Sequence, residues 1–379
     1  MRPPFPFDDD PERFPILSAS RDLECASCRL VHQLNLPEER EGAGRSIENR
    51  PACEEPHTSP TTWAISFLQC GRSRMQRGVR APMRIFLMTT AAVVVAVGAA
   101  TPQPALAWGD EGHEIVALVA QAFLDPDVRS KVNGLLATDT DSLTQHDIAS
   151  EATWADKFRD SNRNGSREKT HLWHFVDIEI SNPNLDRACF ERPQIPAGTV
   201  ASNGPAQDCV VDKVEEFAAE LSFPTTDPEE RIIALKFLLH FVGDLHQPLH
   251  SSDDNDRGGN DKRVMAPGLK AGNLHHFWDT EFVDQLGIDA RSIASDLIGH
   301  ISKAQEQDWS QGTPADWAQE AFKIARDDAY GQLPQPNARQ SYLLTDDYIS
   351  MATQDVGVQL SKAGVRLAFI LNKALGHPR

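Results

Sequence analysis

The stretch that most constrains the fold is residues 237–250, which read FLLHFVGDLHQPLH. His240 and Asp244 are four positions apart on an apolar background, so a helix would present both side chains from one face. Pro248 should end that helix, because proline lacks an amide hydrogen and disfavours helical backbone in the residue before it. We therefore expect His250 to lie just past the helix end and to point separately.

A second pair with the same spacing, His275 and Asp279, lies in the segment NLHHFWD. Imidazole nitrogen and carboxylate oxygen are the usual ligands of a catalytic zinc site. A single histidine on an apolar helix face is more often a core residue, but two such pairs favour a metal, because buried polar groups need partners. Eight ligands suit a cluster rather than one four-coordinate zinc. The candidate ligands are His113, Asp156, His174, His240, Asp244, His250, His275 and Asp279.

The charge of the chain is uneven. The 379 residues carry a net charge of −18 at pH 7, which argues against a basic nucleic-acid-binding surface. The first 107 residues contain 12 Arg, no Lys and 12 acidic residues, so the whole net charge lies in the remainder. Bound divalent cations would offset this charge locally, so a phosphate substrate is not excluded.

The N-terminal part has the features of an export signal. Residues 1–82 are rich in Pro, Arg, Glu and Ser and show no sustained periodicity, so we expect a mis-called or disordered extension. Residues 83–107 begin with Met83 and an arginine, continue with an apolar run and end in A-L-A at Ala107. The run is short for a membrane span, so a signal peptide is favoured over a membrane anchor. The mature, exported protein would begin at Trp108.

From Trp108 onward the sequence predicts an all-α fold, a single mostly helical domain over 108–379. Residues 178–209 read as a long loop, bracketed by Cys189 and Cys209, which should pair in an exported protein. A second loop, 252–273, should contain a short hairpin near Arg263 and Val264. The expected helices cover 112–124, 127–136, 143–159, 211–222, 228–246, 274–286, 289–306, 314–328 and 341–375.

Six motifs, in this order, resemble those of the exported, zinc-dependent, single-strand-specific nucleases and 3′-nucleotidases, the S1/P1 nucleases. The resemblance covers essentially all of 108–379. It implies the fold of zinc-dependent phospholipase C and a site with three zinc ions. The motifs are WGDEGH at 108–113, ATWADKFR at 152–159, HFVD at 174–177, HFVGDLHQPLH at 240–250, GGN at 258–260 and NLHHFWD at 273–279.

The resemblance also implies how the ligands divide among the zinc ions. Asp244 would bridge two of them, and Trp108 would bind through its α-amino nitrogen, freed by signal cleavage, and its carbonyl oxygen. By position, the three sets are Asp156, His174, His240 and Asp244; Trp108, His113 and Asp244; and His250, His275 and Asp279.

Four residues have implied roles in catalysis and substrate binding. Asp156 would orient the attacking water and Arg159 would neutralise the phosphoryl group, and a three-residue spacing lets one helix face present both. Phe175 would stack on a base and Asp177 would bind the base edge. Without the resemblance, Arg159 would read as a solvated helix end or an ion pair, and Phe175 as ordinary core.

The expected function is hydrolysis of single-stranded DNA and RNA to 5′-nucleotides, with 3′-nucleotidase activity as a further expectation. The substrates would be nucleic acids and nucleotides, with no obligate protein partner and no membrane association after signal cleavage. The alternatives are a zinc-dependent phospholipase C and an exported zinc-binding protein without catalysis. Among the remaining histidines, His171, His246 and His276 are expected in the core or behind the ligands, and His146, His300 and His377 on the surface.

Overall fold

The computed structural model of the protein describes residues 108–376. The extension expected at 1–82, the signal peptide expected at 83–107 and His377 all lie outside the described residues. Within 108–376, no helix is both long and apolar enough to cross a bilayer.

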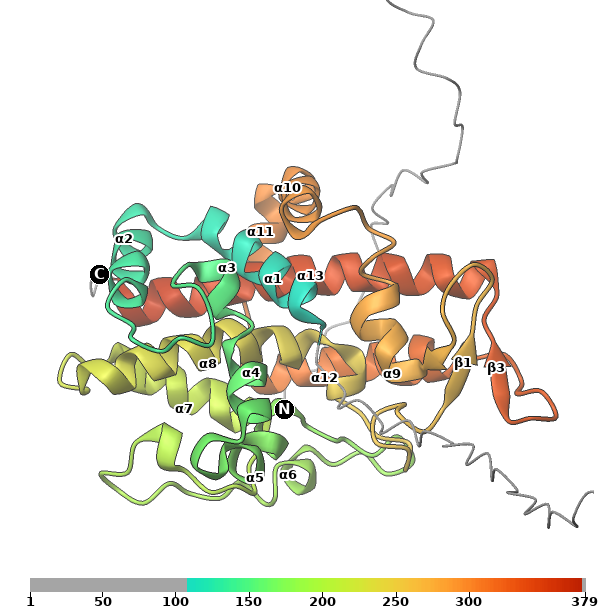
Figure 1. The fold of residues 1–379 in the computed structure, drawn as a ribbon, viewed down its shortest axis with the longest axis horizontal. Helices are drawn as coiled ribbons and strands as arrows, with labels where there is room; N and C mark the ends of the chain where they lie inside the picture. Colours follow the sequence, from blue (N-terminus) through green and yellow to red (C-terminus); the bar gives the residue numbers. More distant parts are fainter. Residues whose placement is uncertain (1–107, 377–379) are drawn as a thin grey trace, which may run out of the picture. The chain divides into compact units, whose positions relative to one another are not determined.

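The core is built around α8 (Pro228–His246), the helix predicted from the apolar stretch. Every α8 residue from Ala234 to His246 is buried. The helices packed on it include α1 (Asp110–Phe123), α7 (Val210–Ser222) and the long α13 (Asp346–Leu375). Figure 1 shows α13 running along the domain beside α8 and α12. Because this part of α8 is enclosed on several sides, the polar side chains of His240, Asp244 and His246 face protein rather than water.

The predicted all-α fold is confirmed, since only three short strands accompany the helices in 108–376. Shorter elements complete the fold. The remaining α-helices are α2 (Pro126–Leu136), α3 (Ile148–Glu151), α4 (Trp154–Ser161), α5 (Ser166–Thr170), α6 (Leu185–Ala188), α9 (Leu274–His276), α10 (Ala290–His300), α11 (Lys303–Trp309) and α12 (Pro314–Ile324). The 3₁₀ turns cover Arg163–Gly165, His171–His174, Ala201–Asn203 and Pro248–His250, and π-helical turns cover Phe277–Glu281 and Ala325–Tyr330.

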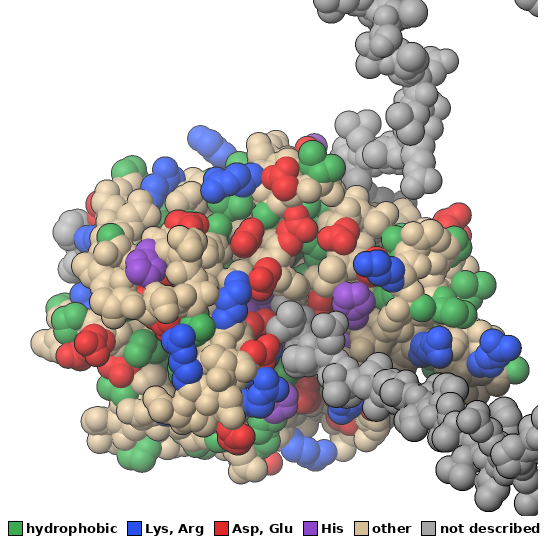
Figure 2. Space-filling model, viewed as in Figure 1, with side chains coloured by type: hydrophobic (Ala, Val, Ile, Leu, Met, Phe, Trp, Pro, Cys, Tyr) green, Lys and Arg blue, Asp and Glu red, His purple; other side chains and the backbone are tan. Residues whose placement is uncertain are grey.

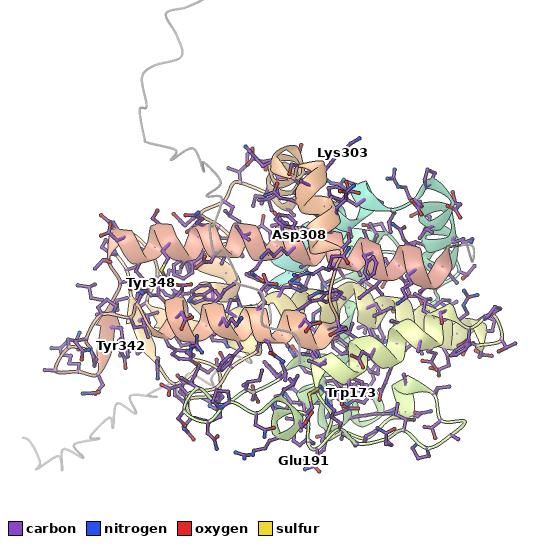
Figure 3. The ribbon with its side chains drawn as sticks, turned by 180° about the vertical axis from the view of Figure 1, so that it is seen from behind. Trp173, Glu191, Lys303, Asp308, Tyr342 and Tyr348 are labelled. Carbon is purple, nitrogen blue, oxygen red and sulfur yellow. A yellow bond between two sulfur atoms is a disulfide. The ribbon has the colours of Figure 1, made fainter. Side chains whose placement is uncertain are left out.

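The three strands form one small sheet in the order β2-β1-β3. Strand β1 (Arg263–Met265) pairs antiparallel with β2 (Gly272–Asn273), so the predicted hairpin is present. Strand β3 (Ser341–Leu343) joins β1 in parallel, and the expected helix start at 341 is therefore wrong. Thr345 caps α13 instead, because its side chain accepts a hydrogen bond from the amide of Tyr348. Figure 3 shows Tyr342 of β3 and Tyr348 of α13 at the same end of the domain.

Two other expected helices are divided. The segment 143–159 forms α3 and α4, which meet at Ala152 and Thr153. The segment 289–306 forms α10 and α11, because Ser302 and Gln305 make a capping box that starts a new helix. The loop 178–209 contains only two short helical turns, and the predicted disulfide Cys189–Cys209 is present with an S–S distance of 2.04 Å.

Candidate metal centre

The centre of the site is the C-terminal half of α8. His240 and Asp244 are fully buried and lie one helical turn apart on the same face, as predicted. Helix α8 ends at His246, and the 3₁₀ turn Pro248–His250 then directs His250 toward the same interior region. The turn at Pro248 thus changes the direction of the chain and brings His250 toward the buried face of α8.

Backbone carbonyls orient three of the candidate imidazoles. In each ring the Nδ1 atom faces a carbonyl, so Nδ1–H donates to it and Nε2 keeps its lone pair for another partner. The pairs are His240 Nδ1 with Ala152 O at 2.7 Å, His250 Nδ1 with His174 O at 2.9 Å and His275 Nδ1 with Gly258 O at 2.6 Å.

The arrangement of the remaining nitrogens fits a bound cation. His250 Nε2 and His275 Nε2 lie 3.1 Å apart, and both are acceptors when each Nδ1 donates to its carbonyl. In the described part of the chain, His174 Nε2, His240 Nε2 and Asp244 Oδ1 are buried without a hydrogen-bond partner. Buried lone pairs that converge without donors are costly, and a metal ion would satisfy them together.

Two carboxylates join the histidines into one cluster. Asp244 Oδ2 lies 2.9 Å from His174 Nδ1, and its Oδ1 lies 3.4 Å from His113 Nε2. Asp156 Oδ1 lies 3.5 Å from His240 Nε2. Burial raises the pKa of Asp244 well above its usual range, and the charge of Asp156 raises it further. A bound cation would oppose both effects and favour the ionised carboxylate.

The donor atoms gather in groups that largely follow the expected sets. His250, His275 and Asp279 form one group, which is the whole of one expected set. His174, His240 and Asp244 form another, which lacks only Asp156 of its expected set. His113 lies with Asp156 and His240 as well as near Asp244, so it borders both of the first two sets. The groups with donor atoms within 4.8 Å of one another include His250, His275 and Asp279; His174, His240 and Asp244; and His113, Asp156 and His240.

The segment that begins at Trp108 lies against this cluster. Trp108 is fully buried, and its Nε1–H donates to the carbonyl oxygen of Gly243 at 2.7 Å. The amide of Gly109 donates to the carbonyl oxygen of Asp279 at 3.0 Å. A Cβ atom at Gly243 would lie 2.9 Å from His113 Nδ1, so glycine is needed there for α8 to approach α1.

Arg159 is part of the interior, not of a solvated helix end. Its side chain is 3% exposed, with Nη1 at 2.6 Å from Asp156 Oδ1 and Nε at 3.0 Å from Asp160 Oδ1. Burial alone would lower the pKa of Arg159, but the Asp156 and Asp160 carboxylates together outweigh burial and raise the pKa. A permanently charged guanidinium thus lies beside the candidate ligands. The contact with Asp160 was not predicted from the sequence.

Phe175 and Asp177 follow the 3₁₀ turn His171–His174 and border the cluster. Phe175 is half-buried, and its ring stacks on that of His250 with centroids 4.4 Å apart. Asp177 is exposed. Because the Phe175 ring is half-buried beside the candidate metal ligands, it can contact a bound substrate. A ring that only filled the core would be fully buried.

One buried residue of the site was not singled out from the sequence. Gln247 donates from Nε2 to Asp279 Oδ1, and its Oε1 accepts from the amide of Leu249 at 2.5 Å. It therefore holds a candidate ligand from behind. Its only signal was its position between Asp244 and His250 in the central motif.

The other histidines divide between core and surface. His246 is buried as expected, with Nδ1 bonded to Val242 O and Nε2 to Arg366. His171 and His276 were expected in the core or behind the ligands; both are exposed, so neither lies in the core. His146 and His300 are exposed as predicted.

Comparison with known proteins agrees with this architecture. The family model described as S1/P1 Nuclease matches residues 108–376. The chain is similar to Nuclease PA3 of Penicillium sp, 29% identical over 287 residues that cover 71% of this chain and 98% of the relative. It is also similar to Nuclease S1 of Aspergillus oryzae, 28% identical over 293 residues (72% and 93%), and to Endonuclease 2 of Arabidopsis thaliana, 28% identical over 294 residues (71% and 91%). The resemblance seen in the motifs is thus confirmed, and the chain belongs to the S1/P1 nuclease family.

Proposed function

We propose that this protein is an exported nuclease that uses three zinc ions to hydrolyse single-stranded DNA and RNA to 5′-nucleotides, with 3′-nucleotidase activity at the same site. The observation that carries the proposal is the convergence of buried histidine and aspartate donors, above all the 3.1 Å approach of His250 Nε2 to His275 Nε2. Membership of a nuclease family makes a phosphodiester the substrate class.

The proposed ligands are the nine residues identified from the sequence. Asp244 would bridge two zinc ions, since its two oxygens face different histidines. Bound zinc supplies Lewis acidity: it lowers the pKa of water to about 7 and offsets charge on the phosphodiester. The sets are Asp156, His174, His240 and Asp244; Trp108, His113 and Asp244; and His250, His275 and Asp279.

The chain's own residues would orient the reaction. Arg159 Nη1 lies 2.6 Å from Asp156 Oδ1 and favours the ionised carboxylate, which would accept a hydrogen bond from the attacking water. Arg159 would donate to a phosphoryl oxygen as negative charge builds up. Attack of water on phosphorus would form a new P–O bond and break the P–O3′ bond. One fragment would keep a 5′-phosphate, and the leaving O3′ of the other would take up a proton to become a 3′-hydroxyl.

Phe175 and Asp177 would bind the base of the nucleotide. One face of the Phe175 ring lies on His250, so the opposite face would receive the base and Asp177 would bind its edge. Stacking on an aromatic ring needs an unpaired base and tolerates any base, at about 1–3 kcal/mol each. This supports a preference for single strands.

Export is supported by the disulfide Cys189–Cys209, since such bonds persist in oxidising compartments. The two alternative functions share the metal centre with the nuclease. The family match favours the nuclease over a phospholipase C. The buried Arg159 beside Asp156 favours catalysis over simple zinc binding, which has no need of it.

The test uses protein that begins at Trp108. We expect three zinc ions per chain by elemental analysis, cleavage of denatured DNA and RNA faster than duplex DNA, and phosphate release from 3′-AMP. Cleavage of phosphatidylcholine vesicles without cleavage of DNA would replace the nuclease by the phospholipase. Zinc uptake without hydrolysis of any of these substrates would support the alternative of a zinc-binding protein without catalysis.

A further inference from the structure

Beside the metal centre, one carboxylate holds two arginines. Asp160 Oδ1 accepts a hydrogen bond from Arg159 Nε at 3.0 Å and another from Arg167 Nη2 at 3.3 Å. Arg159 is buried, whereas the side chain of Arg167 is 46% exposed. Asp160 therefore links the guanidinium next to the candidate ligands with one that faces solvent.

An exposed imidazole, that of His171, lies on the same side. Arg167 belongs to α5, and the backbone stays helical through Thr170 and His171 into the next turn, so Arg167 and His171 share a face at a spacing of four residues. The exposed His171 ring lies 6.0 Å from that of Phe175, in an edge-on arrangement. Burial and the charges of Arg159 and Arg167 all lower the pKa of His171, as expected for neighbouring positive groups.

The surroundings make this grouping unusual. The chain carries a net charge of −18, and Figure 2 shows basic side chains scattered among acidic ones over one face of the domain. If a base of a single-stranded substrate stacks on Phe175, the strand continues past the scissile phosphate to a neighbouring phosphate. A strand of phosphates would need local positive charge to approach such a protein.

We propose that Arg167 and His171 form a phosphate-binding lip that holds a phosphodiester flanking the scissile one. Arg167 would contact the phosphate through the part of its guanidinium that Asp160 leaves free, and His171 would add a hydrogen bond. Asp160 acts as a positioning residue, because it fixes the direction of Arg167 relative to Arg159. The inference rests on the proposed nuclease function and defines where a longer strand lies.

The experiment compares Arg167→Gln, Arg167→Lys and His171→Gln with the matched control Arg129→Gln, at an exposed arginine on α2. The zinc-loaded protein is assayed on a thymidine octanucleotide and on a thymidine dinucleotide, which has no flanking phosphate. Equilibrium binding of a phosphorothioate octanucleotide is measured by fluorescence anisotropy at several salt concentrations.

For Arg167→Gln we expect a KM for the octanucleotide raised about two- to fivefold at low salt, as for loss of one exposed ion pair. The increase should be smaller for the dinucleotide, and kcat should change little. The slope of log affinity against log salt should fall by about 0.7, the value for one phosphate contact in a single strand. Arg167→Lys should keep that slope, His171→Gln should raise the octanucleotide KM selectively, and Arg129→Gln should change nothing.

Equal effects of Arg167→Gln on both substrates, or an unchanged salt slope, would overturn the lip while leaving the nuclease intact. Failure of the unsubstituted protein to cleave either substrate would instead count against the proposed function. Zinc content and the far-ultraviolet circular dichroism of each variant separate these outcomes from misfolding.

Discussion

The side chains of His174 and Asp244 lie 2.9 Å apart, Nδ1 to Oδ2, although 70 positions separate them in the sequence. The other oxygen of Asp244 faces His113 at 3.4 Å. A carboxylate with histidines on both sides has the disposition of a bridging ligand, and the strongest tests of the metal centre concern this residue and those packed around it.

Asp244→Asn should remove more than one zinc ion, because an amide offers one ligand oxygen and no charge to a site that needs both carboxylate oxygens. We expect activity on denatured DNA to fall by more than the 10- to 100-fold typical of residues that only orient a ligand. Zinc per chain would be measured by elemental analysis. The exposed Asp308→Asn on α11 is the control, and three zinc ions retained by Asp244→Asn would contradict the bridge.

Retention of Ala107 should impair metal binding. An amide nitrogen is a poor ligand, so a chain in which Trp108 is not the first residue would lose the proposed α-amino ligand. Trp108 is already held by its bond to Gly243, so the effect should appear in zinc content rather than in folding. Full zinc occupancy and full activity of such a protein would show that the amine is not used.

Gly243→Ala should disturb His113. The added Cβ would lie 2.9 Å from His113 Nδ1, and overpacking of this kind costs about 1–3 kcal/mol. We expect a lower melting temperature and weaker zinc binding. Gly134→Ala on α2 is the matched control, since no atom lies within 4 Å of its added Cβ, and it should stabilise the helix by about 0.5–1 kcal/mol.

Lys236→Met should be strongly destabilising. Lys236 is 1% exposed, pairs with Asp139 and Glu151, and lies 4.2 Å from the centre of the Trp154 ring. Removing one partner of a buried ion pair costs about 3–5 kcal/mol, because the other charge stays buried. Urea unfolding would measure the loss against the exposed Lys323→Met. A change below about 1 kcal/mol would mean that solvent reaches the pair.

Glu320 should make stability depend on acid pH. Burial alone would raise its pKa, but Arg366 and Lys362 outweigh this and lower it to about 2. A carboxylate with a depressed pKa stabilises the fold above its unfolded value near 4.5 and loses that contribution as the pH falls toward 2. We expect this shift to contribute about 3 kcal/mol to stability at pH 7.

The measurement is urea unfolding of the natural protein and Glu320→Gln across this range. The variant should be less stable at pH 7, and the difference should shrink between pH 4.5 and 2. A difference that stays constant over that interval would show that the contribution of Glu320 does not come from its charge.

Local sequence was sufficient for much of the helical architecture. The spacing of His240 and Asp244 and the stop at Pro248 predicted α8 and its functional face, because helix periodicity and proline geometry are properties of neighbouring residues. Prediction from local sequence failed where a segment can form either a helix or a strand and a distant element decides between them. The segment at 341–345 became a strand and a cap because β1 offers it hydrogen bonds that no local pattern reveals.

The sequence by itself determined which residue types could bind metal, which helices carry them and which family the chain resembles. The resemblance also placed Asp244 between the expected sets that contain His113 and His174. Only the tertiary structure decided that Asp160 joins Arg159 to Arg167 and that Gln247 holds Asp279. The reason is physical: periodicity sets the direction of a side chain from its own helix, whereas its partners depend on how distant helices pack.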